Sequence, residues 1–404
     1  MTTRNDPGGW GLGAGKPPNE HPDPKPGASG TVSDYTERDL IARIQQRLPP
    51  APDWLLVGIG DDAAVVEPEA NRVEVLSVDA IVDGVHVDRR FVPPDAIGHR
   101  ALAVNLSDLA AMGALPRLAL LSMVLPRDFR VDDFDRLADG FAALASRHRV
   151  HVVGGNLTGT SGPLTVDVTV IGTVKRRQAL TRAGARAGDE VYVSGSIGSA
   201  AAGLRLLREA SSVVSRQSSV VGQHSSVAGP GGRSSDLKSD DSGLKTDDLG
   251  LKSVDLGLTI DDVRLTTAYL RPEPRIRLGL MLSRNRAATA CVDLSDGLAD
   301  GLHQIADASG VGVAIDEEML PIEPTARRIL GPHTEDTTLT AISAGDDYEL
   351  LFTVRPRSRH HLSAAARHGA APFTRIGVCT ERREVTIVRS GTVQPIPRGY
   401  SHFR

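Results

Sequence analysis

Hydrophobic residues recur along this chain at two spacings, the alternation typical of strands and the three-to-four-residue spacing typical of helices. In the first half, residues 74–82 (EVLSVDAIV) and 164–174 (LTVDVTVIGTV) are rich in β-branched residues and predict strands. Residues 96–114 and 131–148 carry apolar side chains at helical spacing. This alternation of strands and helices predicts an α/β (α+β) fold for the first half.

The second half of the chain repeats this texture. Its predicted elements are a strand in 189–195, a helix in 199–210, a strand running into a helix in 289–310, and strand-containing segments in 311–319 and 343–354. The pattern divides near residue 176, so we predict two domains, residues 31–176 and 177–404, each large enough to bury its own core.

Two segments lack any such pattern. Residues 1–30 are dense in Gly, Pro and polar residues, which predicts a disordered tail. Residues 211–258 hold two tandem heptapeptide arrays, of which the second reads LKSDDSG, LKTDDLG, LKSVDLG. Glycine in each of these units and sparse apolar positions argue against a coiled coil. We therefore predict a floppy insertion in a surface loop, where extra length costs little free energy.

Composition excludes several classes of protein. Among 404 residues, 46 Lys and Arg stand against 50 Asp and Glu, so no basic field points to nucleic acid as a partner. The two cysteines, Cys291 and Cys379, cannot form a disulfide framework and fit a reducing cytoplasm. No apolar run approaches the roughly 20 residues that span a membrane, and the N-terminus lacks the apolar core of a secretory signal. We expect a cytoplasmic protein that is not bound to a membrane.

Aspartates gather at the ends of the predicted elements. They stand in GIGDDAAVV (Asp61, Asp62), SVDAIVDG (Asp79), NLSDLAAMG (Asp108), VDLSDG (Asp293, Asp296) and AGDDYE (Asp346, Asp347). Small flanking residues let a phosphate approach closely. Converging carboxylates repel unless a cation neutralises them, and Mg²⁺ takes such oxygen ligands together with substrate phosphates. This machinery suffices for phosphoryl transfer, although a single acidic pair is more often a solvated turn or a helix cap.

Other signals are weaker. The chain has no G-x-x-x-x-G-K-[ST] loop, no kinase catalytic loop and no G-x-S-x-G elbow. The run SGSIGSAAAG is either an anion-binding turn at a helix start or simply a tight turn. His86 lies near Asp79 and Asp83, but a lone strand histidine is usually structural. Arg182 is either a phosphate clamp or a surface charge.

Nine motifs occur in a fixed order and together carry a resemblance. They are GIGDDAAVV, SVDAIVDGVHV, ALAVNLSDLAAMGA, VVGGN, ALTRAGARAGDEVYVSG, RPEPRI, VDLSDGL, SAGDDYELLF and GYSHF. This series resembles the thiamine-monophosphate kinase family, of the aminoimidazole-ribonucleotide-synthetase-like superfamily, over about residues 34–403. The resemblance implies that superfamily's two-domain fold, with an N-terminal sheet forming the interface of a homodimer and a C-terminal α/β domain. It also implies Mg²⁺-dependent transfer of phosphate from ATP to thiamine monophosphate, giving thiamine diphosphate and ADP.

The resemblance also assigns roles to residues at matching positions. Several Mg²⁺ ions would be held by Asp62, Ser77, Val78, Asp79, Asp108, Asp293 and Asp296. ATP would contact Gly155, Asn156, Arg182 and Ser295, and thiamine monophosphate would contact His86 and Asp346. No general base is assigned, because a phosphate oxygen of the acceptor is already anionic near neutral pH and can attack directly in line.

Four positions depart from the family pattern. Asn156 replaces an aspartate, Asp346 a glutamate, Val78 a threonine and Pro397 an aromatic residue. Asparagine withdraws a negative charge from the metal site, and Val78 could offer a metal only its backbone oxygen. Two alternatives therefore stay open: a non-catalytic, degenerate member that binds a nucleotide or thiamine phosphate, and a relative of the purine-pathway cyclo-ligase.

Overall fold

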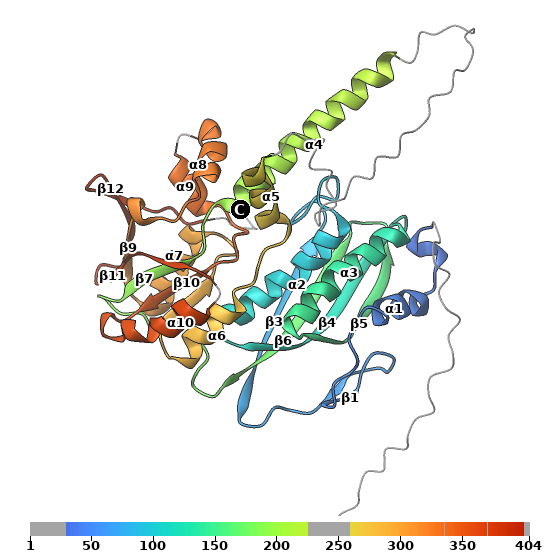
Figure 1. Cartoon of the computed structure of the whole chain (residues 1–404), viewed down its shortest axis with the longest axis horizontal. Coiled ribbons are helices and arrows are strands. Elements are labelled where there is room, and N and C mark those ends of the chain that lie inside the picture. The colour runs from blue at the N-terminus through green and yellow to red at the C-terminus, as the bar shows by residue number, and fades with distance from the viewer. Residues whose placement is uncertain (1–29, 225–258, 335, 370, 400–404) are drawn as a thin grey trace, which may run out of the picture.

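In the computed structural model of this chain, which describes residues 30–224, 259–334, 336–369 and 371–399, two α/β halves lie side by side (Figure 1). The predicted tail, apart from Gly30, and residues 225–258 of the predicted insertion lie outside these ranges. The mixed α/β fold class predicted from the hydrophobic pattern is confirmed.

The first half is built on a four-stranded sheet that carries two long helices on one face (Figure 1). Its elements are η1 (Val32–Asp34), α1 (Glu37–Gln45), β1 (Leu55–Val57), β2 (Val65–Val66), β3 (Arg72–Val82), α2 (Pro94–Ala111), β4 (Leu115–Pro126), α3 (Val131–His148), β5 (His151–Thr160) and β6 (Thr165–Lys175). The sheet order is β3-β6-β4-β5, so β3 and β5 are its two edges. β1 and β2 form a separate small hairpin.

The helices α2 and α3 approach each other closely because glycine stands where they cross. A Cβ atom at Gly98 of α2 would lie 1.9 Å from the carbonyl oxygen of Leu137 in α3. Any larger residue at this position would push the helices apart, since interiors have no room to yield. The covered face of the sheet is correspondingly tight, and Val168 and Val170 of β6 are fully buried there.

The second half is built on a seven-stranded sheet in the order β13-β12-β9-β11-β7-β10-β8. Its elements are β7 (Glu190–Ser194), α4 (Ser199–His224), α5 (Ile260–Leu270), α6 (Ile276–Arg284), β8 (Ala290–Asp293), α7 (Leu298–Ser309), β9 (Gly312–Asp316), η3 (Glu317–Met319), α8 (Pro324–Leu330), η4 (Gly331–His333), α9 (Thr337–Ser343), β10 (Leu350–Val354), η5 (Pro356–His361), α10 (Leu362–His368), β11 (Phe373–Thr380), β12 (Val385–Arg389) and β13 (Thr392–Pro395). Every residue of β7, β8 and β10 is buried, so both faces of the sheet are covered there.

Helix α4 is longer than the sequence pattern predicts. The predicted helix ends at residue 210, but α4 continues to His224 and includes the first two heptapeptide units. These units contain no proline and a single glycine, Gly222, so nothing in them stops a helix that has already begun. The prediction of an unstructured segment from residue 211 is wrong for residues 211–224. Neither α4 nor any other helix in the described ranges has the length and apolar composition needed to cross a membrane.

Helix α2 joins the two halves. Fifteen of its eighteen residues are buried, because it packs on its own sheet and also against α6, β8 and α5 of the second half. Gly279 of α6 makes this approach possible, since a Cβ there would lie 2.0 Å from the carbonyl oxygen of Ala110. One hydrophobic core consequently runs from the first half into the second and includes Leu109, Leu280 and Phe352.

Candidate functional site

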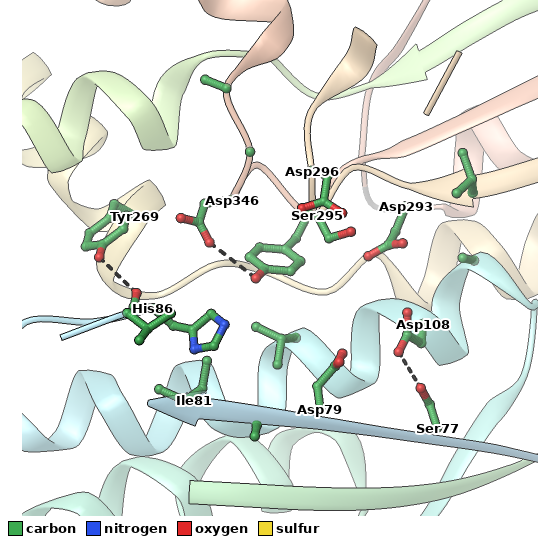
Figure 2. A pocket seen from close by; sticks show the side chains of 18 of the residues that line it. Ser77, Asp79, Ile81, His86, Asp108, Tyr269, Asp293, Ser295, Asp296 and Asp346 are labelled. Atoms are coloured by element: carbon green, nitrogen blue, oxygen red, sulfur yellow. Dashed lines mark hydrogen bonds between the residues drawn. The ribbon is translucent and has the colours of Figure 1, made fainter. Parts of the chain in front are cut away.

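A cavity of about 1190 Å³ opens between the two halves, beside the joint formed by α2. Its walls come from β3 and α2 on one side and from the loops around β8 and β10 on the other (Figure 2). Nine of the residues predicted from the sequence line it: Ser77, Asp79, His86, Asp108, Arg182, Asp293, Ser295, Asp296 and Asp346. Segments more than 200 residues apart in the chain thus meet at one place.

The first-half wall presents two carboxylates. Asp79 lies on β3 with its backbone N–H donating to Oδ1 of Asn105 at 2.9 Å, and Asp108 follows Asn105 by one turn of α2. The Ser77 hydroxyl donates to Asp108. Burial raises the pKa of Asp79, and the charge of Asp108 beside it raises that pKa further. Burial likewise raises the pKa of Asp108. These two groups therefore resist being ionised together.

The second-half wall contributes Asp293, Ser295 and Asp296, which face the first pair across the cavity (Figure 2). Asp293 is the last residue of β8 and is 5% exposed. Its carboxylate accepts a hydrogen bond of 2.8 Å from the hydroxyl of Ser107 on α2, which ties the two walls together. Burial raises the pKa of Asp293 and Asp108 adds to this effect, while Arg182 opposes it.

These carboxylates form pairs rather than one compact cluster. Among the described residues, no three His, Cys, Asp or Glu side chains are placed to hold a single metal ion. The oxygens instead lie on two facing walls, Asp79 and Asp108 on one and Asp293 and Asp296 on the other. Such a cavity can share cations between protein carboxylates and the oxygens of an anionic ligand.

The other end of the cavity is formed by His86, Tyr269 and Asp346 (Figure 2). Nδ1 of His86 accepts a hydrogen bond of 3.1 Å from the backbone N–H of Val82, so in the neutral ring the proton is on Nε2. The Tyr269 hydroxyl donates to the carbonyl oxygen of His86 at 3.3 Å. His86 therefore has a structural role in the turn after β3 and also faces the cavity.

Four predicted site residues lie away from the cavity within this chain. Asp62 is exposed in the loop between β1 and β2. The Val78 side chain is 58% exposed and, one residue from Ser77 and Asp79 on β3, points to the opposite face of the sheet. Gly155 and Asn156 lie on β5, the edge of the sheet opposite β3. Their predicted contacts with metal and ATP stay predictions.

The glycine-rich run SGSIGSAAAG forms a tight turn at the start of α4, and a protein carboxylate occupies it. Asp347 accepts hydrogen bonds from the backbone N–H groups of Gly198 at 2.7 Å and Ala200 at 3.2 Å. Its burial raises the pKa of Asp347 to about 8, although these two donors oppose the shift. The start of α4 is thus already occupied by a carboxyl group of the chain itself.

Sequence reasoning did not identify three residues of the cavity region: Arg100, Ser107 and Tyr348. Arg100 is eight positions before Asp108 in α2, on a neighbouring part of the same helix face. An arginine among the mainly apolar residues of this helix was the available signal, because a buried charge requires a partner. That partner, Asp346, is distant in the sequence and could not be identified before folding.

Residues 60–174 match the family described as AIR synthase related protein, N-terminal domain, and residues 245–390 match its C-terminal domain. A thiamine-monophosphate kinase of Bacillus subtilis is 33% identical over 351 residues, covering 86% of this chain and 94% of that protein. The resemblance drawn from the nine motifs is confirmed.

Solved structures of thiamine-monophosphate kinases share the fold of this chain. The crystal structure of a thiamine-monophosphate kinase from Stenotrophomonas maltophilia superposes with a TM-score of 0.69 at 36% identity, covering 89% of this chain and 98% of that one. The structure of AaThiL complexed with AMPPCP and TMP superposes with a TM-score of 0.62 at 27% identity, covering 91% and 96%. The two-domain fold is thus shared along nearly the whole length of these proteins.

Proposed function

This chain belongs to the thiamine-monophosphate kinase family, and we propose that its carboxylate-lined cavity transfers the terminal phosphate of ATP onto thiamine monophosphate. The observation that carries this proposal is the meeting of Asp79 and Asp108 with Asp293 across one cavity between the halves. AMPPCP, an ATP analogue, is bound together with TMP in the related AaThiL structure, which supports a site for two phosphate-bearing substrates.

Magnesium is part of the proposal, and the donor set of the cavity fits it. Burial raises the pKa of Asp79, Asp108 and Asp293, and for Asp79 and Asp293 the neighbouring carboxylates raise it further. A divalent cation would reverse this effect by favouring the ionised form. Mg²⁺ typically takes one or two protein carboxylates and completes its shell with water and phosphate oxygens. Carboxylates arranged in facing pairs suit that chemistry, and Ser77 and Asp296 are further candidate oxygen donors.

The residues of the chain mainly position two anions. A phosphate oxygen of thiamine monophosphate forms a bond to the terminal phosphorus of ATP while the bond to ADP breaks, and ADP leaves with the electron pair. The acceptor oxygen is already anionic, so no protein base is needed. Arg182 lies near Asp108 and Asp293 and offers a guanidinium to the phosphates, and Ser295 lies on the same side. Magnesium, when bound, supplies positive charge that offsets the repulsion between the two substrates.

At the opposite end we propose that His86 and Asp346 contact the thiamine part of the acceptor. Thiamine carries a fixed positive charge on its thiazolium ring, and the carboxylate of Asp346 faces the cavity there. Asp346 is one methylene shorter than the glutamate usual in the family. The shorter side chain places the carboxylate nearer the backbone, so the fit of this end differs from the family pattern.

We further propose a homodimer formed through the open face of the four-stranded sheet. Val78, Thr169 and Leu120 lie opposite one another across β3, β6 and β4, and Val78 and Leu120 are 58% and 38% exposed. Asn156 pairs with Ser122, two residues along from Leu120, and so lies on this same face. A second copy packed on this face would cover Val78 and Leu120. Asn156, which does not reach the cavity of its own chain, could then reach the cavity of the other copy.

We place the boundary between the two domains near residue 176, after β6. A cytoplasmic location is supported by Cys291 and Cys379, which are both buried and form no disulfide.

The test is release of ADP, measured with a coupled assay in the presence of ATP, Mg²⁺ and thiamine monophosphate. We expect ADP release that depends on thiamine monophosphate. Comparing the turnover of Asn156→Asp with that of the parent measures how much activity the missing carboxylate accounts for. Binding of nucleotide without turnover in the parent, with turnover restored in N156D, would instead support the degenerate, non-catalytic alternative.

A further inference from the structure

We infer that Arg100, a buried arginine of α2, is a positioning residue that holds Asp346 toward the thiamine end of the cavity and fixes the second half against the first. This inference rests on the function proposed above. It concerns a residue that itself contacts neither the facing carboxylates nor the reacting phosphates.

The guanidinium of Arg100 forms its hydrogen bonds and ring contacts with residues of the second half. Its side chain is 1% exposed, and Nη2 donates to Oδ1 of Asp346 at 2.6 Å. Nη1 donates to the carbonyl oxygen of Tyr269, the tyrosine whose hydroxyl holds the His86 turn. The guanidinium also lies 4.5 Å from the ring centre of Tyr269 and 5.9 Å from that of Tyr348. One side chain therefore connects α2, α5 and the loop before β10.

The carboxylate that Arg100 holds is only partly buried. The Asp346 side chain is 33% exposed, lines the cavity and accepts a second hydrogen bond of 3.2 Å from the Tyr348 hydroxyl. Both bonds reach the same oxygen, Oδ1. A carboxylate oriented in this way by two fixed donors keeps its other oxygen available to a ligand in the cavity.

The four-residue segment 346–349 is anchored at every side chain. Asp347 occupies the start of α4. Glu349 accepts a hydrogen bond of 2.7 Å from Arg275, the residue before α6, and one of 2.5 Å from Ser194 of β7. Asp346 and Tyr348 are held by Arg100 and by each other. Of these anchors, Arg100 alone belongs to the first half, so it links this segment of the second half to the wall that carries Asp79 and Asp108.

The backbone of this segment is strained, which indicates that its geometry matters. Asp346 has a φ of 71° and Tyr348 a φ of 49°, left-handed conformations that non-glycine residues rarely adopt. Such conformations are unfavourable and persist where surrounding contacts enforce them, commonly at binding sites. The bonds from Arg100 are among those contacts, and they keep the strained carboxylate at the cavity wall.

The experiment compares Arg100→Lys and Arg100→Met with the parent by steady-state kinetics and by calorimetric titration of thiamine monophosphate. Lysine keeps the charge but cannot donate from two fixed nitrogens at once, and methionine removes both bonds. We expect KM and Kd for thiamine monophosphate to rise about ten- to a hundredfold in R100M and less in R100K. KM for ATP should change by less than about threefold, because Arg100 acts at the other end of the cavity.

A double-mutant cycle with Asp346→Asn tests whether Arg100 acts through that residue. The effects of R100M and D346N should then be far from additive. Arg43→Lys is the matched control, because Arg43 is also buried and pairs with Asp135 at 2.5 Å, but lies away from the cavity. It should match the loss of thermal stability in R100K and leave both KM values unchanged.

The outcomes separate this inference from the proposed function. An active parent beside a folded R100M or R100K with unchanged KM and Kd for thiamine monophosphate would overturn the role of Arg100 alone. Equal rises in KM for both substrates would also overturn it, by indicating a general structural defect. A parent that neither binds nor phosphorylates thiamine monophosphate would overturn the proposed function, and this inference with it.

Discussion

The two sheets of this protein differ in how many of their faces are covered. The seven-stranded sheet is packed on both faces at β7, β8 and β10, which have no exposed residue. The four-stranded sheet is packed by α2 and α3 on one face only, and Val78 and Leu120 are exposed on the other. Continuous apolar strands are typical of the first arrangement and alternating strands of the second.

This difference shows how each half contributes to the site. In the second half, Asp293 sits at the end of a fully buried strand and is held rigidly. In the first half, Asp79 lies on an edge strand whose opposite face is open, so that sheet has both a cavity side and a side available to a partner. We therefore expect the buried strands of the seven-stranded sheet to hold Asp293 in place, and the proposed dimer to form on the open face of the four-stranded sheet.

We expect the largest effect on stability from Phe352→Ala in β10. Phe352 is fully buried, and its ring lies 5.6 Å from those of Tyr192 and Phe373. Removing it should lower the free energy of unfolding by about 3–5 kcal/mol, through lost burial and the cavity left behind. Val393→Ala in β13, an edge strand of the same sheet, is the control, because Val393 is 63% exposed and should cost less than about 0.5 kcal/mol. Equal losses of the free energy of unfolding in urea denaturation would contradict the importance of the buried strands of this sheet for stability.

Asp293→Asn should reduce kcat about a hundredfold or more while leaving the fold intact. The folded-state pKa of Asp293 is raised, so its ionised form costs stability near neutral pH, and asparagine should maintain or increase thermal stability. The Oδ1 atom of asparagine can still accept the bond from Ser107. Asp307→Asn, at an exposed ion pair with Arg398, is the control and should keep parental kinetics. Parental turnover in D293N would remove Asp293 from the site.

Leu76→Glu tests the open face. Leu76 is 63% exposed on β3, and the proposed dimer would bury a charge from each copy there. We expect the dimer dissociation constant, measured by sedimentation equilibrium, to rise at least about tenfold, with the circular dichroism spectrum unchanged. Val393→Glu introduces the same charge on the other sheet and should leave assembly unaffected. A monomeric parent, or a dimer indifferent to L76E, would mean that another surface is the interface.

The smallest effect is expected at the joint between the sheets. His99 of α2 donates from Nε2 to the carbonyl oxygen of Pro272 at 2.9 Å, and burial lowers its pKa to about 4, an effect strengthened by Arg271 and Arg147. The unfolded chain, with an ordinary histidine pKa, therefore binds a proton between about pH 6.5 and pH 4 that the folded chain does not. As the pH is lowered from 6.5 to 4, the free energy of unfolding should therefore fall by about 1–2 kcal/mol more in the parent than in His99→Gln. Parallel pH profiles for the two proteins would contradict this assignment.

The helices and strands of the first half could be predicted from the periodicity of hydrophobic residues, whereas the end of α4 and the long-range contacts could not. The strands at 72–82 and 165–175 and the helices at 94–111 and 131–148 match the predicted ones closely, because alternating and helical spacings are strong over such lengths. Helix α4 exceeds its prediction because residues 211–224 contain no proline and only one glycine, so a helix that has already begun continues through them. The pairing of Asp347 with the start of α4 could not be predicted, since it joins residues about 150 positions apart.

The sequence by itself determined the fold class, the family and nine residues that line the cavity, because short motifs place aspartates at element ends whatever the rest of the chain does. Only the tertiary structure decided which of them meet. It set Asp79 and Asp108 opposite Asp293, gave Asp346 a partner in Arg100, and left Asn156 on the open face of the sheet. The physical reason is that burial, hydrogen bonding and mutual repulsion depend on distances in space, and spacing along a chain does not specify those distances.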